Sequence, residues 1–127
     1  MRVLPIGMIR RPSGRFVTFN RWDVVRVAYP FIEGDQTKHR PGLVVSTDTF
    51  HRRHQACYVA MITTAKAGLK PDDILITDNE NAGLPEPCVI RVSRLVTLTA
   101  TQMSRRVGTI PAKDRNAAAA LLKKFIS

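Results

Sequence analysis

Arg40 is the residue of this sequence with the best-defined chemistry, because its neighbours hold it in place. It lies in residues 38–46, KHRPGLVVS, where three basic residues run into a proline and then an apolar run. Pro41 disfavours helical backbone in the residue before it, so Arg40 is expected to be extended at the mouth of a strand. A guanidinium held there can give a phosphate two parallel charge-assisted hydrogen bonds. The alternative is a surface salt bridge with Glu33 or Asp35.

His39 is a second chemical candidate, since an imidazole titrates near neutral pH and can carry a proton. Successive residues of a strand point to opposite faces, however, so His39 and Arg40 converge only if the preceding loop twists. The alternative for His39 is an exposed histidine in a loop.

A metal site is the third chemistry to weigh. Residues 51–54, HRRH, together with Cys57 place potential metal ligands at a spacing of three. The two arginines of this segment would repel a cation, and the sequence offers no clear fourth ligand. We therefore expect no metal and no cofactor, and interpret HRRH as a basic surface turn that faces RNA or solvent.

The overall charge predicts a polyanionic partner. The 127 residues are near the usual size of one domain and carry 20 Lys and Arg against 10 Asp and Glu, with a pI near 10.6. Nucleic acid is the first partner to expect, although charge alone gives only non-specific affinity. Cys57 and Cys88 have no CxxC spacing, which is typical of reduced, buried thiols in a cytosolic protein. No apolar run has the length of a signal peptide or a membrane span, so we expect a cytoplasmic protein without a membrane partner.

The elements that must position these residues are mostly short strands. Residues 1–20 are interrupted by glycine and proline, which predicts an arm with one short strand near residues 16–19. Residues 30–39 are expected to form a long loop before the Arg40 segment. Runs rich in β-branched residues predict strands at residues 23–29, 43–46, 56–62, 74–77, 88–92, 94–98 and 107–110.

The chain ends in a predicted helix at residues 112–126, which is rich in alanine and has lysines in its last turn. Ala118, Leu121, Leu122 and Phe125 fall at helical spacing and are expected to pack on a sheet. Many strands followed by one helix, without regular β–α alternation, predict a mainly β (α+β) fold. We expect a strongly bent antiparallel sheet or a partly open barrel with a C-terminal helix.

Several segments, taken together, resemble the PemK/MazF/Kid family, the toxins of type II toxin–antitoxin modules. They are DVVRVAYPF, KHRPGLVVS, a strand ending in ITT, GLPEPCVIR, and LVTL before RRVGTI, in the order and spacing of the family. The resemblance covers about residues 22–126. We therefore expect an N-terminal basic arm at residues 1–21 and a PemK/MazF-like toxin domain at residues 22–127.

The resemblance implies an SH3-like barrel, a homodimer, and a sequence-specific, metal-independent endoribonuclease that acts on single-stranded RNA. It also implies a cognate antitoxin protein whose disordered tail blocks the RNA groove. In such cleavage the 2′-OH attacks the adjacent phosphorus and leaves a 2′,3′-cyclic phosphate. The alternatives are a toxin of the same fold that binds DNA gyrase and cleaves nothing, and a pseudo-enzyme that only binds nucleic acid.

Position by position, the resemblance places the family's catalytic basic residue on Arg40 and its catalytic hydroxyl on Thr63. Arg40 would stabilise the phosphoryl oxygens, because a pKa above about 12 makes arginine a poor general base. Thr63 would hold the scissile phosphate by a hydrogen bond. The residues expected to contact RNA are Lys38, His39, Thr64, Arg91 and Ser93.

The sequence departs from the family pattern at two places. Ser93 stands where one branch of the family has an aspartate, and a serine cannot act as a carboxylate base. Trp22 precedes Asp23 where the family has a glycine, which changes the turn or presents an aromatic ring on which a base can stack.

Overall fold

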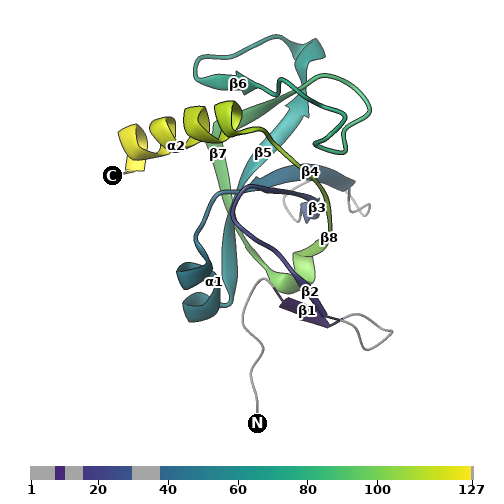
Figure 1. The fold of residues 1–127 in the computed structure, drawn as a ribbon, viewed down its shortest axis with the longest axis vertical. Helices are drawn as coiled ribbons and strands as arrows, with labels where there is room; N and C mark the ends of the chain where they lie inside the picture. Colours follow the sequence, from purple (N-terminus) through teal and green to yellow (C-terminus); the bar gives the residue numbers. More distant parts are fainter. Residues whose placement is uncertain (1–7, 11–15, 30–37, 127) are drawn as a thin grey trace.

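The computed structural model describes residues 8–10, 16–29 and 38–126, and within them the main feature is one bent antiparallel sheet (Figure 1). Its six strands run in the order β6-β7-β5-β4-β3-β8, and the outer strands β6 and β8 do not pair with each other. The sheet is therefore open, and the predicted bent antiparallel sheet with a C-terminal helix is confirmed. The strands are β3 (Asp23–Tyr29), β4 (Lys38–Val44), β5 (Ala56–Thr64), β6 (Asp73–Leu75), β7 (Cys88–Thr99) and β8 (Met103–Thr109).

Alternation of side chains along the strands gives the sheet two apolar faces. One face, here called the helix face, packs against the C-terminal helix through a buried cluster that includes Val24, Leu43, Ile62, Ile90 and Ala118. The other face, here called the arm face, carries Val25, Val27, Val44 and Val59, and Phe19, which follows the N-terminal hairpin, belongs to the same buried cluster. A polar side chain can therefore be assigned to a face from its position in a strand.

Helix α2 (Ala112–Ile126) has the predicted bounds and crosses the β6–β7 end of the sheet (Figure 1). Asp114 in its first turn is buried and accepts hydrogen bonds from the N–H of Thr77 at 3.0 Å and from its hydroxyl at 3.2 Å. The expected stripe packs at Ala118 but not at Phe125, which is 49% exposed because the helix runs past the sheet. No helix among the described residues is long and apolar enough to cross a membrane.

Strand β4 begins earlier than predicted, at Lys38, so that Arg40 and Pro41 lie inside the strand. Pro41 pairs with Arg26 of β3, whereas the pairing of β4 with β5 begins only at Gly42. Proline has no N–H to donate to a ladder, which explains why β4 keeps one partner strand at this point and leaves the other. Of the predicted loop, residues 30–37 lie outside the described residues.

The remaining differences from the predicted elements are local. Residues 88–92 and 94–98 belong to one strand, β7, with a register shift where two strands were predicted. In place of one N-terminal strand there is a hairpin of β1 (Met8–Arg10) and β2 (Phe16–Thr18). Two short 3-10 helices also occur, η1 (Ala65–Ala67) and η2 (Ala100–Gln102).

Helix α1 (Asp48–His54) replaces the predicted HRRH surface turn. The prediction that this segment faces RNA or solvent is wrong for His51, which is buried. His51 is 1% exposed, and its Nε2 lies 2.6 Å from Oγ of Ser46, which also accepts the N–H of Tyr58 at 2.9 Å. Burial lowers the pKa of His51. The pair fastens α1 to the segment after β4, and because it is enclosed we assign it a structural role.

Candidate functional site

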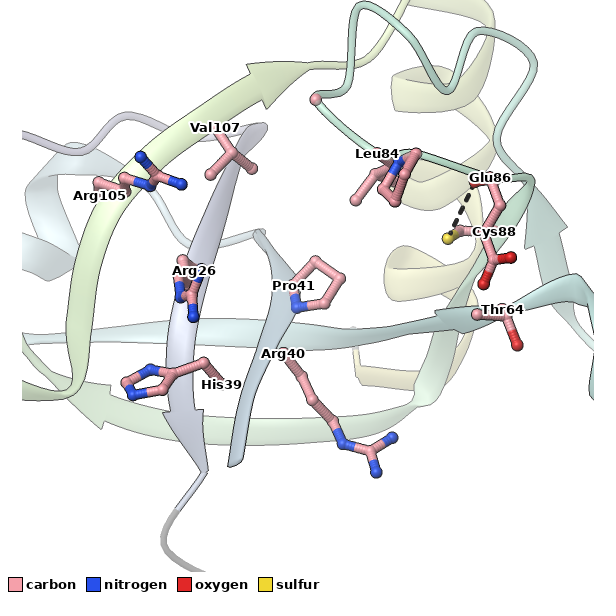
Figure 2. Close-up of a pocket in the computed structure, with 12 residues that line it drawn as sticks. Arg26, His39, Arg40, Pro41, Thr64, Leu84, Glu86, Cys88, Arg105 and Val107 are labelled. Carbon is pink, nitrogen blue, oxygen red and sulfur yellow. Dashed lines mark hydrogen bonds between the residues drawn. The ribbon is translucent and has the colours of Figure 1, made fainter. Parts of the chain in front are cut away.

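A cavity of about 300 Å³ lies on the helix face, at the end of the sheet where β4 begins and β5 ends (Figure 2). Three strands contribute basic side chains to one side of it: Arg26 of β3, His39 of β4 and Arg105 of β8. Arg40 of β4 is also a lining residue. The other side is largely apolar and is formed by Leu84 and Pro85, while Val107 of β8 adds apolar surface beside Arg105. The basic side chains of this cavity make it a candidate anion site.

The side chains of His39 and Arg40 lie on opposite faces of β4, because they are successive residues of the strand. His39 pairs with Ala28 and shares the helix face with Arg26, whereas Arg40 pairs with Val27, which is buried on the arm face. Figure 2 shows the Arg40 guanidinium directed away from the His39 ring and from Arg26. Arg40 therefore reaches the cavity only at its rim, and its guanidinium belongs to the arm face.

Thr63, the proposed partner of Arg40, lies on the same face as Arg40. Gly42 of β4 pairs with Met61 of β5, and two residues further along the two antiparallel strands are Arg40 and Thr63. Residues two apart in a strand share a face, so the guanidinium and the hydroxyl both lie on the arm face at the end of the sheet. A guanidinium and a hydroxyl both carry donors that phosphate oxygens can accept. Thr64, the next residue, instead lines the cavity on the helix face.

Arg91 also belongs to the arm face, since it pairs with Met61, but its guanidinium is already engaged. Its Nε and Nη2 donate to the two carboxylate oxygens of Asp73 at 3.1 and 3.0 Å. The side chains of Arg91 and Asp73 are 15% and 1% exposed, respectively. Only the N–H groups that Asp73 leaves free remain available for a phosphate.

The Arg91–Asp73 pair should make the stability of the protein sensitive to acid. The hydrogen bond from Arg91 lowers the pKa of Asp73 below its ordinary value. The pair therefore stabilises the fold fully above the unfolded-state pKa of about 3.9, and this stabilisation is lost as the pH falls through the lower folded-state pKa. We expect Asp73→Asn to lose less stability than the wild type between about pH 5 and pH 2.

Urea unfolding of both proteins at a series of pH values measures this difference. Asp72→Asn is the matched control, because Asp72 is the preceding residue and is exposed. Parallel pH profiles for the wild type and Asp73→Asn would show that the ion pair contributes nothing to acid sensitivity.

The two other residues expected to contact RNA are Ser93 and Lys38. Ser93 is an exposed residue in the part of β7 where the register with β5 shifts, and it lines a separate cavity near the end of α2. Lys38 is the first residue of β4 and pairs with Tyr29. Its side chain lies outside the part of the chain that is described. The structure thus groups Arg40, Thr63 and Arg91 on one face and His39 and Thr64 on the other.

Arg26 and Arg105 are the cavity residues that the sequence analysis did not single out. They pair directly across β3 and β8, and both are exposed. The signal in the sequence is the single arginine that interrupts the apolar run DVVRVAY. Only the register of β3 with β8 shows that a second arginine stands opposite.

Neither cysteine is poised to act as a nucleophile or a ligand. Both are free and buried, as predicted. Burial raises the pKa of Cys57 to about 12 and also raises the pKa of Cys88, so both remain thiols at neutral pH. In the described ranges, no three His, Cys, Asp or Glu side chains gather as a metal-binding group.

Trp22 adopts the backbone conformation that a glycine would take there, with a φ of 74°. Its N–H donates to the carbonyl of Val44 at 2.7 Å, and its ring packs against the cluster of the helix face. The guanidinium of Arg21 lies 4.4 Å from the ring centroid. The ring is therefore a half-buried packing element with one face taken by a cation, which leaves little of it for stacking a base.

Comparison with known proteins places this chain in one family, and the relatives that it matches are named as members of that family. Residues 20–126 match the family model described as the PemK-like, MazF-like toxin of type II toxin–antitoxin systems. Endoribonuclease MazF2 of Mycobacterium bovis and endoribonuclease MazF6 of Mycobacterium tuberculosis are each 31% identical over 77 residues. That alignment covers 59% of this chain and 67% of each relative.

Solved structures show the same fold at lower identity. The toxin MazF-mt6 of Mycobacterium tuberculosis has a TM-score of 0.64 at 20% identity, covering 80% of this chain and 93% of that one. MazF of Deinococcus radiodurans has a TM-score of 0.66 at 16% identity, with 84% and 94% covered. A mycobacterial endoribonuclease solved with its cognate antitoxin has a TM-score of 0.62 at 17% identity, with 83% and 89% covered.

Proposed function

This chain belongs to the PemK-like, MazF-like family of type II toxin–antitoxin toxins, and from this premise we propose its activity. We propose that it cuts single-stranded RNA at a specific sequence without a metal ion. The chain is an endoribonuclease toxin of that family, in keeping with its relatives named endoribonuclease. The finer proposal concerns the site and the chemistry. The observation that carries it is the shared face of Arg40 and Thr63 at the ends of two neighbouring strands.

In the proposed reaction the 2′-oxygen of one ribose attacks the adjacent phosphorus while the bond from phosphorus to the 5′-oxygen breaks. The 2′-OH loses its proton and the departing 5′-oxygen gains one, which leaves a 2′,3′-cyclic phosphate and a 5′-OH. Negative charge builds on the non-bridging oxygens during this step, and a guanidinium held beside them stabilises it. Arg40 takes this role and Thr63 holds the phosphate by its hydroxyl. His39 takes no part in proton transfer, because its ring lies on the opposite face of the strand.

Two kinds of partner follow from the same proposal. The net charge of +10 favours an acidic antitoxin segment and speeds its encounter at low salt. Solved relatives include MazE–MazF complexes, which supports a cognate antitoxin for this chain. A homodimer is supported by the apolar end of α2, where Phe125 and Ile126 are 49% and 64% exposed.

Replacing Thr63 with valine should lower the rate of RNA cleavage by about 10- to 100-fold, because a hydrogen bond to a charged phosphate is lost. Valine keeps the shape of threonine, so the strand end should remain intact. Thr64→Val is the matched control, since Thr64 is the next residue and lines the cavity on the other face.

Single-turnover cleavage of a mixed-sequence RNA in EDTA measures both variants. The proposal expects a much larger loss for Thr63→Val than for Thr64→Val. The reverse order would move the scissile phosphate to the helix face and contradict the assignment. RNA that is bound but left intact by the wild type would favour a gyrase-binding toxin or a nucleic-acid-binding pseudo-enzyme.

A further inference from the structure

We propose that Arg26 and Arg105 form a phosphate-binding subsite for RNA on the helix face, next to the cleavage site. The inference rests on the proposed function and adds a second point of contact for the same substrate. It starts from the register of the sheet, in which Arg26 of β3 pairs directly with Arg105 of β8.

Two like charges placed directly opposite on neighbouring strands repel each other, so the arrangement favours an anion between them. No carboxylate in the described part of the chain forms an ion pair with either guanidinium. Arg106, the next residue of β8, differs in this respect because its Nε lies 3.7 Å from a carboxylate oxygen of Asp23. Of these two arginines of β8, Arg106 therefore has a carboxylate partner, whereas Arg105 lies opposite another arginine.

The other charged groups of the cavity leave this positive charge in place. His39 lines the same side of the cavity as the two arginines (Figure 2). Glu86 is the acidic residue of the lining, and its carboxylate already lies 3.1 Å from Nζ of Lys66. Among the described residues of the lining, the arginine pair therefore faces no unbalanced carboxylate.

The opposite wall is suited to a nucleobase. Leu84 and Pro85 present apolar surface across from the arginines, and Val107 adds apolar surface beside Arg105. The backbone of this loop packs closely on β8, since a Cβ on Gly83 would lie 2.1 Å from the carbonyl oxygen of Val107. Every base has an apolar ring face that packs against such a wall without regard to sequence. A volume of about 300 Å³ is at the lower end for ligand sites, so the cavity fits one nucleotide.

The position of the cavity favours RNA over an acidic peptide as its occupant. Arg40 stands at its rim, and Thr63 precedes Thr64, which lines it. A nucleotide held by Arg26 and Arg105 would therefore belong to the same strand as the phosphate held by Arg40 and Thr63. The RNA would pass around the end of the sheet from one face to the other.

The test is binding of a fully 2′-O-methylated, mixed-sequence RNA, which cannot be cleaved by 2′-OH attack, at several salt concentrations. Arg26→Ala and Arg105→Ala should each weaken binding about tenfold, as expected for a lost charge-assisted contact. Each should also reduce the slope of log K against log salt by about 0.7. Arg105→Lys should keep the slope and lose part of the affinity, because lysine keeps the charge but not the planar fork.

Arg94→Ala is the matched control, since Arg94 is exposed on β7 and is not part of the cavity lining. Losses at Arg26 and Arg105 no larger than at Arg94 would overturn the subsite. Unchanged RNA binding with weakened binding of a glutamate-rich peptide would overturn it in favour of a protein site. If the variants lose RNA binding as expected but the wild type leaves unmodified RNA intact, the subsite stands and the nuclease proposal fails.

Discussion

Replacing Arg40 with alanine is expected to lower the single-turnover rate of RNA cleavage by about 10²- to 10³-fold. Alanine removes the donor that would face the phosphoryl oxygens when their charge builds up. Arg91, which lies on the same face, already gives two of its N–H groups to Asp73. The loss should appear in the rate of the chemical step more than in RNA affinity.

Two comparisons separate this effect from a loss of structure. Within the described residues Arg40 forms no ion pair, so Arg40→Ala should unfold at nearly the temperature of the wild type. Arg40→Lys should show an intermediate rate, because a lysine supplies charge without the two parallel hydrogen bonds. A wild-type rate in Arg40→Ala would remove Arg40 from the mechanism.

Replacing Gly83 with alanine should destabilise the protein by about 2–5 kcal/mol, because it combines backbone strain with a steric clash. Gly83 has a φ of 76°, which L side chains rarely adopt, and a Cβ there would lie 2.1 Å from the carbonyl oxygen of Val107. That atom is backbone and cannot move aside as a side chain can. The same contact sets the apolar wall of the cavity, so RNA binding should fall as well.

Two other glycines separate the causes of this destabilisation. Gly68 also has a positive φ, of 84°, but a Cβ there meets nothing within 4 Å, so Gly68→Ala carries the backbone strain alone. Gly108→Ala carries the clash alone, since a Cβ there would lie 2.2 Å from the carbonyl carbon of Ala82. Urea unfolding should rank Gly83→Ala above Gly68→Ala. If both variants lose the same free energy of unfolding, the predicted clash between a Cβ at position 83 and the carbonyl of Val107 does not occur.

Local sequence patterns predicted the elements whose signals lie within one segment. The run DVVRVAY predicted β3, and the alanine-rich end of the chain predicted α2 with its observed bounds. The start of β4 was misplaced because a proline argues against a strand, while Pro41 is tolerated where β4 has lost its β5 partner. His51 was predicted to be exposed, and this was wrong because its ring is buried against Ser46. The spacing of residues within the helix does not indicate that contact.

The sequence predicted those features of the site that depend on one strand, but not those that depend on how distant strands pair. Alternation along β4 indicated that His39 and Arg40 point apart, and the structure bears this out. The facing of Arg26 and Arg105 depends on the register between β3 and β8, which are far apart in the sequence. The engagement of Arg91 by Asp73 depends likewise on the pairing of β6 with β7. Pairings of this kind are set by tertiary structure and leave no pattern in a single segment.

The measurement that tests the central claim most directly is the chemistry of the fragment ends that the wild-type protein makes from a long, mixed-sequence single-stranded RNA in EDTA. The account predicts 2′,3′-cyclic phosphate and 5′-OH ends. It also predicts that a single 2′-deoxy substitution at a mapped cleavage site stops cleavage there. Fragments with 5′-phosphate ends, continued cleavage at the 2′-deoxy position, or RNA that stays intact would contradict it.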